Sequence, residues 1–400
     1  MNILVLNCGS SSIKYQLLDM SGEPDLKAKG LVERIGLEKG ILTHKAGGKK
    51  HVIEEEIPDH TYGIKLVLDL LVDKQHGVIN SLNELYAVGH RVAHGGDKFS
   101  KSVVIDDQAI AYIQSLCEIA PLHNPANLLG IEAIKNILPN IPQVATFDTA
   151  FHQTIPEEAF NYAIPRNLYE NNKITRYGFH GTSHYFVSKK ACEMLNWDIT
   201  TKKIVTCHLG NGASITAIDK GRSVDTSMGF TPVEGLVMGT RVGDIDAGAV
   251  FYIMEKENLD VKSANTFFNK KCGLTALSNG YSDMRDICNT ASEGNKYSKL
   301  ALNSFVYRVK KYIGAYATIM NGLDLVIMTG GIGENAFGVR NLVFQNMEFL
   351  GIDFDAKKND NLIGEDAILS KENSKVKVMT ICTDEELVIA TDTLNLTKKK

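Results

Sequence analysis

The sequence predicts an α/β fold built from two similar domains with a cleft between them. Apolar runs typical of buried strands alternate with helical patterns along the chain, which is characteristic of this class. The strand–turn–strand pattern of residues 3–19 recurs in the second half, where Ile204 takes the place of Ile3 and Gly210 that of Gly9. The length of 400 residues also favours more than one domain, because a domain typically has about 100–200 residues.

The first half is expected to open with a hairpin. Residues 3–6 are a short apolar run, residues 9–12 (GSSS) form a turn, and residues 13–18 alternate between apolar and polar side chains. The Gly- and Lys-rich stretch 39–50 predicts an exposed hairpin or loop. The other expected elements are helices over residues 61–72, 109–118 and 126–138, strands over residues 86–89 and 144–147, and a glycine-ended loop over residues 90–96.

The second half repeats this organisation. Residues 203–207 predict a strand, residues 210–212 (GNG) a turn, and residues 214–218 a returning strand. The remaining expected elements are a long helix over residues 297–320, a strand over 325–328, a glycine loop over 329–335, a strand over 376–381 and a helix over 385–396.

Composition restricts the classes of function. Hydrophobic residues make up 44% of the chain and charged residues 22%, as in ordinary soluble globular proteins. The formal net charge of −4 leaves no basic excess for nucleic acid or an anionic membrane surface, so neither is expected as a partner. The three lysines at residues 398–400 are expected to form a short solvated tail.

The cysteines and the apolar runs indicate a cytoplasmic enzyme or binding protein. Seven cysteines are present, an odd number without a CxxC pair, which argues against a disulfide framework or a zinc ribbon and favours a reducing compartment. No secretory signal is apparent, and no apolar run approaches the ~20 residues of a membrane helix.

Three glycine turns follow predicted strands, at Gly9, Gly210 and Gly331. Such turns expose backbone N–H groups, which favours phosphate, although each turn alone is also compatible with an ordinary polar loop. Residues 331–336 additionally match the dinucleotide pattern GxGxxA, with Asp353 about 20 residues further on. No GxxxxGK[ST] sequence is present, which excludes a P-loop NTPase. Together the turns suggest two phosphate-binding hairpins that serve one nucleotide.

Cations accompany these turns. Arg91 and Arg241 each lie in a loop with flanking glycines and suit bidentate recognition of carboxylate or phosphate, although a single loop arginine is more often a surface residue. His180 and His184 have the spacing of zinc ligands on a helix, but Gly181 interrupts the helix and no cysteine lies nearby. We therefore expect these histidines to donate to an anion, with a purely structural role as the alternative for each of them.

Three acidic residues are candidates for holding magnesium. Asp148 follows a predicted strand, and Glu385 and Glu386 open the last helix. Magnesium at a nucleotide is usually held by only one or two carboxylates together with phosphate and water. The alternative for Glu385 is an acid that stabilises the start of a helix through the helix dipole.

Several longer motifs resemble those of the acetate kinase family, and the resemblance spans essentially the whole chain. The most specific are RYGFHGTSH at residues 176–184 and TSMGFTPVEGLVMGTR at residues 226–241. The other matching segments are residues 7–14, 90–96, 120–127, 147–152, 208–214, 225–246 and 330–340.

The resemblance implies the actin/Hsp70/sugar-kinase fold, in which two duplicated ribonuclease-H-like domains close on ATP. It implies an N-terminal domain on the acyl and phosphate side, formed by residues 1–150 and joined by the C-terminal helix 385–400. Residues 151–384 would form the nucleotide-binding domain. In this family residues 331–336 contact the adenosine side of ATP, which replaces the dinucleotide interpretation.

The resemblance also implies the members of the active site. ATP would be bound by Asn7, Ser10, Ser12, Lys14, His208, Gly210, Asn211, Gly212, Asp283, Arg285, Gly331, Ile332, Gly333 and Asn335. The acyl group would contact Arg91, Ala93, Leu122, His123, Phe179 and Pro232. The implied catalytic residues are Arg91, Asp148, His180 and Arg241. Mg²⁺, or Mn²⁺ in its place, would be held by Asn7 and Glu385.

The implied reaction is reversible transfer of the γ-phosphoryl group of ATP to acetate, giving acetyl phosphate and ADP by direct in-line displacement, in a homodimer. Arg91 is expected to bind the acetate carboxylate, Arg241 to stabilise transition-state charge, and His180 to bind equatorial phosphoryl oxygens. Asp148 is expected to orient Arg241 or metal-bound water rather than to remove a proton.

Two alternatives remain open from the sequence. Position 93 is often Val in the family and is Ala here, so a propionate or butyrate kinase of the same fold is the first alternative. An Hsp70-like module that grips a peptide under nucleotide control is the second. The sequence argues against it, because no separate peptide-binding domain remains after the two halves are assigned.

Overall fold

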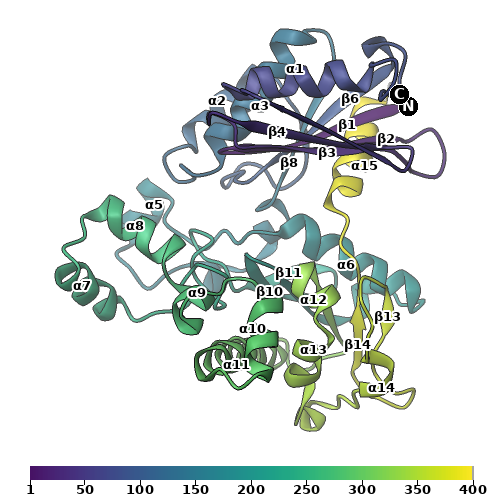
Figure 1. The fold of residues 1–400 in the computed structure, drawn as a ribbon. Helices are drawn as coiled ribbons and strands as arrows, with labels where there is room; N and C mark the ends of the chain where they lie inside the picture. Colours follow the sequence, from purple (N-terminus) through teal and green to yellow (C-terminus); the bar gives the residue numbers. More distant parts are fainter. Residues whose placement is uncertain (399–400) are drawn as a thin grey trace. The chain divides into compact units, whose positions relative to one another are not determined.

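The computed structural model describes residues 1–398 (Figure 1). Lys399 and Lys400 belong to the predicted lysine tail and to the predicted helix over residues 385–400, and they lie outside the described residues. The chain divides into two compact units. Unit 1 comprises Met1–Ala150 and the segment that begins at Asp384, and unit 2 comprises Phe151–Thr383. No helix of residues 1–398 is long and apolar enough to span a bilayer.

Unit 1 contains an eight-stranded sheet of order β5-β4-β3-β2-β1-β6-β8-β7. Its strands are β1 (Asn2–Gly9), β2 (Ser12–Asp19), β3 (Asp25–Glu33), β4 (Gly40–Ala46), β5 (Lys49–Glu55), β6 (Leu85–Val92), β7 (Val103–Val104) and β8 (Gln143–Phe147). Strands β1 to β5 form an antiparallel meander, whereas β6 and β8 run parallel to β1. The predicted hairpins at both ends of the meander are therefore confirmed.

Helices cover both faces of this sheet because alternate residues of each strand point to opposite faces. Leu4 and Leu6 pack with α1 (His60–Leu71) and α3 (Asn124–Ile137), beside which lies α2 (Asp107–Ser115). Ile3 and Val5 pack on the other side against α15 (Glu385–Thr397). Figure 1 shows α15, in yellow, beside β1 and β6 although it comes from the end of the chain.

Unit 2 contains a six-stranded sheet of order β11-β10-β9-β12-β14-β13. Its strands are β9 (Lys203–Leu209), β10 (Ala213–Asp219), β11 (Arg222–Thr226), β12 (Leu325–Thr329), β13 (Ala367–Ile368) and β14 (Lys377–Thr380). Its helices are α4 (Glu157–Phe160), α5 (Arg166–Asn172), α6 (Gly181–Met194), α7 (Ala247–Lys256), α8 (Val261–Lys270), α9 (Gly273–Ser278), α10 (Met284–Ser292), α11 (Lys296–Ile319), α12 (Gly330–Asn335), α13 (Phe337–Phe344) and α14 (Ala356–Asn359). Short 3₁₀ helices lie at Leu82–Glu84, Ala150–Thr154, Ile199–Thr201 and Glu348–Leu350.

The second sheet is also covered on both faces. Cys207 and Ile215 belong to the core cluster that α11 completes with Phe305. Ile204 packs on the opposite face with Val187 of α6. Both faces of the central strands are therefore apolar, as expected for strands buried in an α/β protein.

The two sheets share one topology. In each, a hairpin is extended by a third antiparallel strand and then by two parallel strands, β1-β2-β3 with β6 and β8, and β9-β10-β11 with β12 and β14. The hairpin turns differ in length, because Gly9 pairs with Ser12 in the first and Leu209 with Ala213 in the second. The internal repeat predicted from the sequence is confirmed.

Two boundaries differ from the prediction. The strand expected over residues 86–89 extends to Val92, so His90 and Arg91 belong to β6 rather than to the loop after it. The glycine loop expected over residues 329–335 is largely the short helix α12. Both differences move candidate residues from a loop onto a regular element.

Candidate active site

Three polar side chains lie together at the carboxyl edge of the parallel strands in unit 1. Asn7 is near the end of β1, Arg91 near the end of β6, and Asp148 directly after β8. Parallel strands bring their carboxyl ends to the same edge of a sheet. The Arg91 Nε and Nη2 atoms donate to the two carboxylate oxygens of Asp148 at 3.0 and 2.5 Å, and Nη1 donates to Asn7 Oδ1 at 3.2 Å. The guanidinium is therefore fixed by a bidentate pair and a third hydrogen bond.

Within unit 1, Asp148 orients Arg91, because both of its carboxylate oxygens accept from that guanidinium. The expectation that it orients Arg241 or metal-bound water stays a prediction. The Asp148 side chain is 2% exposed and that of Arg91 24%. Burial acts to lower the pKa of Arg91, but the negative charges of Asp148 and Glu385 outweigh it, so the pKa of Arg91 is raised. Arg91 is therefore a permanent cation at this edge.

Glu385 lies near this pair at the start of α15. The Asp384 carboxylate caps the helix by accepting from the Leu387 amide at 2.9 Å. Burial and the charge of Asp148 raise the pKa of Glu385 to about 7, against the lowering effect of Arg91. Glu385 therefore binds a proton more readily than an ordinary glutamate does.

The donors around Glu385 fit a divalent cation that takes its other ligands from substrate and water. Within residues 1–398, no three His, Cys, Asp or Glu side chains gather as a metal-binding group. Magnesium bound at a nucleotide does not need such a group, since one or two carboxylates usually suffice. A carboxyl group whose pKa is raised by burial and by a neighbouring anion gains from a nearby cation. The surroundings of Glu385 and Asn7 therefore suit a divalent cation.

The first hairpin presents a polar turn beside this edge. Ser10 is exposed and Ser12 half-buried, and a side chain at Gly9 would lie 3.1 Å from Ser12 Oγ. Lys14 on β2 forms an ion pair with Glu386 of α15. The Lys14 side chain is 52% exposed, so its ammonium group lies at the surface of unit 1.

The backbone after β6 is held by two asparagines of α3. The Ala93 amide donates to Asn127 Oδ1 at 3.0 Å, and the His94 amide donates to Asn124 Oδ1 at 3.1 Å. The Asn127 side chain in turn donates to the Cys8 carbonyl on β1 at 2.8 Å. Ala93, which is 3% exposed, is therefore locked against the strand that carries Asn7.

The other predicted acyl contacts are divided between the units. Leu122 and His123 directly precede α3 in unit 1, and Leu122 is 47% exposed. Phe179 and Pro232 belong to unit 2, where Phe179 is buried and the Pro232 carbonyl accepts from Arg241 Nη1 at 3.2 Å. Each unit thus supplies part of the predicted acyl set.

The hairpin turn of unit 2 is flanked by two basic side chains. The Gly210 amide donates to the Gly212 carbonyl at 3.1 Å, which closes the turn. A Cβ on Gly212 would lie 3.3 Å from Arg241 Nη1 and 3.6 Å from His180 Nε2. The absence of a side chain therefore leaves room beside a guanidinium and an imidazole, which is an arrangement suited to an anion.

Arg241 has no carboxylate partner within unit 2. Its Nη1 atom donates to the Pro232 carbonyl and approaches Met238 Sδ at 3.7 Å. Burial lowers its pKa, although a guanidinium remains protonated near neutral pH. A partly buried cation without a counter-ion is favourable where an anionic ligand completes the site.

A chain of buried polar groups orients His180. Its Nδ1 atom is 2.9 Å from Ser214 Oγ, which is 2.8 Å from His184 Nε2, and His184 Nδ1 is 2.7 Å from Thr206 Oγ1. Burial, with the charges of neighbouring histidines, lowers the pKa of His184, which therefore stays neutral. His180 also adopts φ of +56°, a left-handed conformation that is uncommon outside glycine.

His208 is fixed next to His180. The two imidazole rings stack with their centroids 4.2 Å apart, and His208 Nδ1 is 2.8 Å from Ser183 Oγ. Ser183 also contacts Thr383 Oγ1 at 2.8 Å. Sequence reasoning named Ser214 only as part of the glycine turn at Gly210 and assigned no role to Ser183, because a buried serine has no distinguishing pattern. His184 was indicated by the HxxxH spacing and by its place at the end of the RYGFHGTSH motif.

The glycine turn after β12 approaches the end of β9. Gly330 adopts φ of +75°, and a Cβ there would lie 2.8 Å from the Leu209 carbonyl oxygen. A Cβ on Gly331 would meet nothing within 4 Å, so open space lies beside it, and the Asn335 side chain donates to the Gly331 carbonyl at 2.8 Å. Ile332 and Gly333 lie within α12. These residues form one short helical turn.

Two charged residues that sequence reasoning missed hold this turn. Glu334 Oε1 accepts from the amides of Gly330 at 2.8 Å and Thr383 at 3.0 Å. Arg340, which is 0% exposed, donates to the carbonyls of Gly333 at 2.8 Å and Glu334 at 2.9 Å. Because arginine side chains are usually exposed, the sequence does not indicate that Arg340 is buried or that it has this role.

Asp283 and Arg285 are hydrogen-bonded to each other and, within the described part of the chain, not to the glycine turns of unit 2. They form an ion pair at 2.6 Å at the start of α10, and the Arg285 side chain is 87% exposed. Among residues 1–398 neither is hydrogen-bonded to the glycine turns of unit 2.

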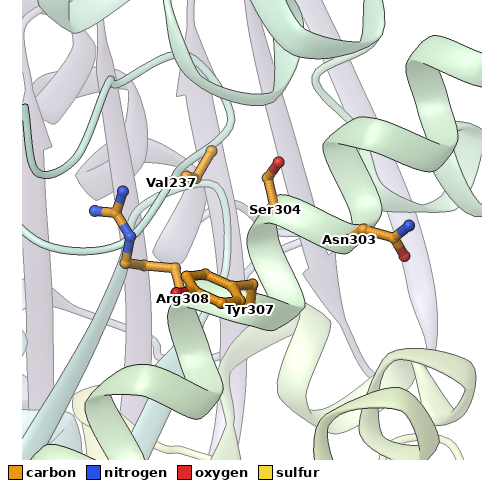
Figure 2. Close-up of a pocket in the computed structure, with 5 residues that line it drawn as sticks. All are labelled: Val237, Asn303, Ser304, Tyr307 and Arg308. Carbon is orange, nitrogen blue, oxygen red and sulfur yellow. The ribbon is translucent and has the colours of Figure 1, made fainter.

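A surface pocket of about 380 Å³ lies elsewhere in unit 2 (Figure 2). It is lined by Val237 and by Asn303, Ser304, Tyr307 and Arg308 of α11. None of the residues predicted for the active site lines it. Val237 nevertheless belongs to the segment that carries Arg241.

Two units of one topology, each with a glycine-containing hairpin and basic side chains at one edge of its sheet, are what a phosphotransferase with an actin-like ATPase fold requires. A profile of the Acetokinase family matches residues 2–391, and the chain belongs to this family. It is therefore a kinase, and the predicted family and fold class are confirmed.

Similar proteins are known across the full length of the chain. It is 53% identical to an acetate kinase of Thermotoga maritima, over 100% of this chain and 99% of that protein. It is 51% identical to an acetate kinase of Bacteroides thetaiotaomicron, over 100% of both. The crystal structure of Porphyromonas gingivalis acetate kinase matches with a TM-score of 0.96 at 47% identity, over 99% of this chain and 100% of that chain. A propionate kinase from Francisella tularensis matches with a TM-score of 0.92 at 41% identity, over 99% of each.

Proposed function

We propose that the enzyme catalyses reversible transfer of the γ-phosphoryl group of ATP to acetate, giving acetyl phosphate and ADP by direct in-line displacement. The observation that carries the proposal is the bidentate pair of Asp148 with Arg91, which occupies both carboxylate oxygens. A kinase that phosphorylates an alcohol needs a general base for the hydroxyl proton. Acetate is already ionised at pH 7, like a Glu side chain with pKa about 4.3, and needs none.

Cations and hydrogen-bond donors supply the catalysis instead. The difficulty is to bring one anion up to the γ-phosphate of another, and preorganised positive groups lower that barrier. Arg91 binds the acetate carboxylate, Arg241 stabilises charge that develops on the transferring group, and His180 binds its equatorial oxygens. The proposal thus assigns groups of both units to one reaction.

The two hairpins and the turn after β12 bind the nucleotide. The phosphates are assigned to residues that share exposed backbone amides or polar side chains, namely Asn7, Ser10, Ser12, Lys14, His208, Gly210, Asn211 and Gly212. The adenosine is assigned to Asp283, Arg285, Gly331, Ile332, Gly333 and Asn335. Open space beside Gly331 supports close approach of a ligand to the backbone there.

Mg²⁺, or Mn²⁺ in its place, is the proposed metal, and Asn7 and Glu385 would hold it through water. When bound, it neutralises charge on the phosphates of ATP. The raised pKa of Glu385, about 7, means that its carboxyl group gains from a cation that keeps it ionised.

The second candidate is a propionate kinase, which one observation favours. Ala93 is buried and presents one methyl group where family members often carry Val.

The resemblance also supports a homodimer in the cytoplasm, with acetyl phosphate as the product in the ATP-consuming direction.

Trapping of the acyl phosphate with hydroxylamine tests the function. The protein is incubated with ATP, magnesium and acetate, propionate or butyrate, and the hydroxamate is measured. The proposal expects most product from acetate. More product from propionate would move the assignment to a propionate kinase, and ATP hydrolysis without hydroxamate would support a nucleotide-controlled binding module.

A further inference from the structure

The segment that carries Arg241 forms a closed loop whose two ends meet. The Asp244 amide donates to the Gly235 carbonyl at 3.0 Å, and the Gly235 amide donates to Asp244 Oδ1 at 2.9 Å. Gly243 adopts φ of +74°, and a Cβ there would collide with the Leu236 carbonyl oxygen of the same loop, so the turn requires glycine. The loop over residues 235–244 therefore has a fixed base.

Helix α11 anchors that base. The Tyr312 hydroxyl lies 3.1 and 3.0 Å from the two Asp244 oxygens and donates to the carboxylate. Arg308 Nη1 forms an ion pair with Asp244 Oδ2 at 2.9 Å and donates to the Gly235 carbonyl at 2.9 Å. The inner face of α11, which includes Phe305, is fully buried in the core of unit 2. Asp244 thus ties the loop to a helix that cannot shift without disturbing the core.

The far end of the loop meets the glycine hairpin turn of unit 2. The Gly239 amide donates to the Asn211 carbonyl at 3.1 Å, and a Cβ on Gly239 would collide with Asn211 Oδ1. Arg241 Nη1 lies 3.3 Å from the position of a Cβ on Gly212. No carboxylate of unit 2 pairs with Arg241, so its guanidinium is placed by the loop that carries it and by the hydrogen bond to the Pro232 carbonyl.

We propose that Asp244, held by Arg308 and Tyr312, is a positioning residue that places the Arg241 guanidinium against the glycine hairpin. The inference rests on the proposed function, in which Arg241 acts on transition-state charge. Such stabilisation depends strongly on distance, and a displacement of about 1 Å can cost about 100-fold in rate. Asp244 acts through Arg241 and touches no substrate.

Figure 2 shows Arg308 of α11 and Val237, which both line the surface pocket. Val237 belongs to the loop over residues 235–244 and Arg308 to α11, so the pocket lies where the loop and the helix meet. The Arg308 side chain is 20% exposed and that of Asp244 34%. Conservative substitutions where the loop and the helix meet can therefore be made without opening the core.

Three variants test the proposal. Asp244→Asn keeps an oxygen for the Gly235 amide but removes the charge that pairs with Arg308. Tyr312→Phe removes only the hydroxyl donor. Asp246→Asn is the matched control, because Asp246 lies two residues further on and caps α7 instead of contacting α11. For each, kcat and the KM values for ATP and acetate are measured, with active sites counted by ADP titration and folding checked by Tm.

We expect kcat per ADP-binding site to fall about 10–100-fold in Asp244→Asn and about 3–10-fold in Tyr312→Phe, with KM values within about 3-fold of the parent. Asp246→Asn should stay within about 2-fold. A kcat of Asp244→Asn within about 2-fold of the parent, an equal loss in the control, or a rise in KM alone would overturn the proposal. If Asp244→Asn does not fold, Tyr312→Phe decides by the same criteria. A parent enzyme that forms no acetyl phosphate would instead refute the proposed function.

Discussion

Arg91 and Arg241, the two arginines assigned to the proposed site, differ in their hydrogen-bond partners. Arg91 is paired with Asp148 and bonded to Asn7, so its guanidinium is fixed before any substrate binds. Arg241 lies at the glycine hairpin with no carboxylate partner in its unit. A fixed cation suits ground-state recognition of a carboxylate, whereas a cation without a counter-ion responds most to charge that develops during the reaction.

Alanine substitution of each arginine should therefore give different kinetic results. Arg241→Ala should lower kcat by about 10²–10³-fold with little change in the acetate KM, because it removes a donor used in the transition state. Arg91→Ala should raise the acetate KM as well. Steady-state kinetics on both variants checks this. A change in KM alone for Arg241→Ala, or an unchanged acetate KM for Arg91→Ala, would show that the roles are wrongly assigned.

Glu385 should make stability depend on pH in a defined direction. Its folded pKa of about 7 lies above the ordinary value of 4.5, so the folded state binds the proton more tightly. The resulting stabilisation is fully present below about pH 4.5 and is lost as pH rises through about 7. Glu385→Gln stays neutral, so it should become more stable than the parent at pH 8, by on the order of 3 kcal/mol, with little difference at pH 4.5.

Urea titrations followed by circular dichroism, without metal or nucleotide, measure that difference. The comparison of variant with parent at each pH isolates Glu385 from the other titrating groups. A stability difference that is the same at pH 4.5 and pH 8 would mean that the folded state does not shift the pKa of Glu385.

Ala93 should widen the acyl specificity if it lines the pocket. Val at this position would fill space for about one or two carbons, and one methylene in such a pocket changes binding by only about 1–3 kcal/mol. Acetate should be the best substrate, propionate a strong second and butyrate detectable. Ala93→Val should lower kcat/KM for propionate more than for acetate. Equal losses on both acids would indicate that Ala93 does not face the acyl chain.

At the scale of elements, the turn from β12 into α12 depends on one glycine. Gly330 has φ of +75°, and a side chain there would lie 2.8 Å from the Leu209 carbonyl oxygen, whereas a side chain at Gly331 would meet nothing within 4 Å. Gly330→Ala should therefore destabilise unit 2 by about 2 kcal/mol or more. Gly331→Ala, the matched control, should change stability by less than about 1 kcal/mol.

Urea unfolding followed by tryptophan fluorescence measures both changes, because the single tryptophan of the chain, Trp197, lies in unit 2. Equal stability of the two variants would mean that neither the backbone conformation nor the contact with β9 matters at Gly330.

Elements were predictable from sequence where their buried side chains are apolar. The hairpins β1-β2 and β9-β10 show apolar alternation, and α11 has a long apolar stripe, so all of them were expected. Helix α6 was not expected, because its buried face includes Thr182, Ser183, His184 and Ser188. His184 and Ser183 belong to the histidine network, so the buried face of α6 is polar. The sequence therefore lacks the apolar periodicity by which a helix is recognised.

At the scale of the whole molecule, the repeated topology followed from the sequence because a hairpin with glycine in its turn occurs twice. The site was predictable only as a set of residue types. The pairing of Asp148 with Arg91 was not, since it depends on β6 and β8 being neighbours in the sheet. The clamp of Arg340 on α12 was also missed, because a charged side chain is expected at the surface.

The central claim is that one phosphoryl group passes directly from ATP to acetate with no covalent enzyme intermediate. The stereochemical course at phosphorus tests this most directly. ATP made chiral at the γ-phosphorus with oxygen isotopes is incubated with the enzyme, magnesium and acetate, and the configuration of the acetyl phosphate is determined. A single in-line displacement inverts the configuration, and inversion is the predicted result. Retention would require two displacements through a phosphorylated side chain and would contradict the account.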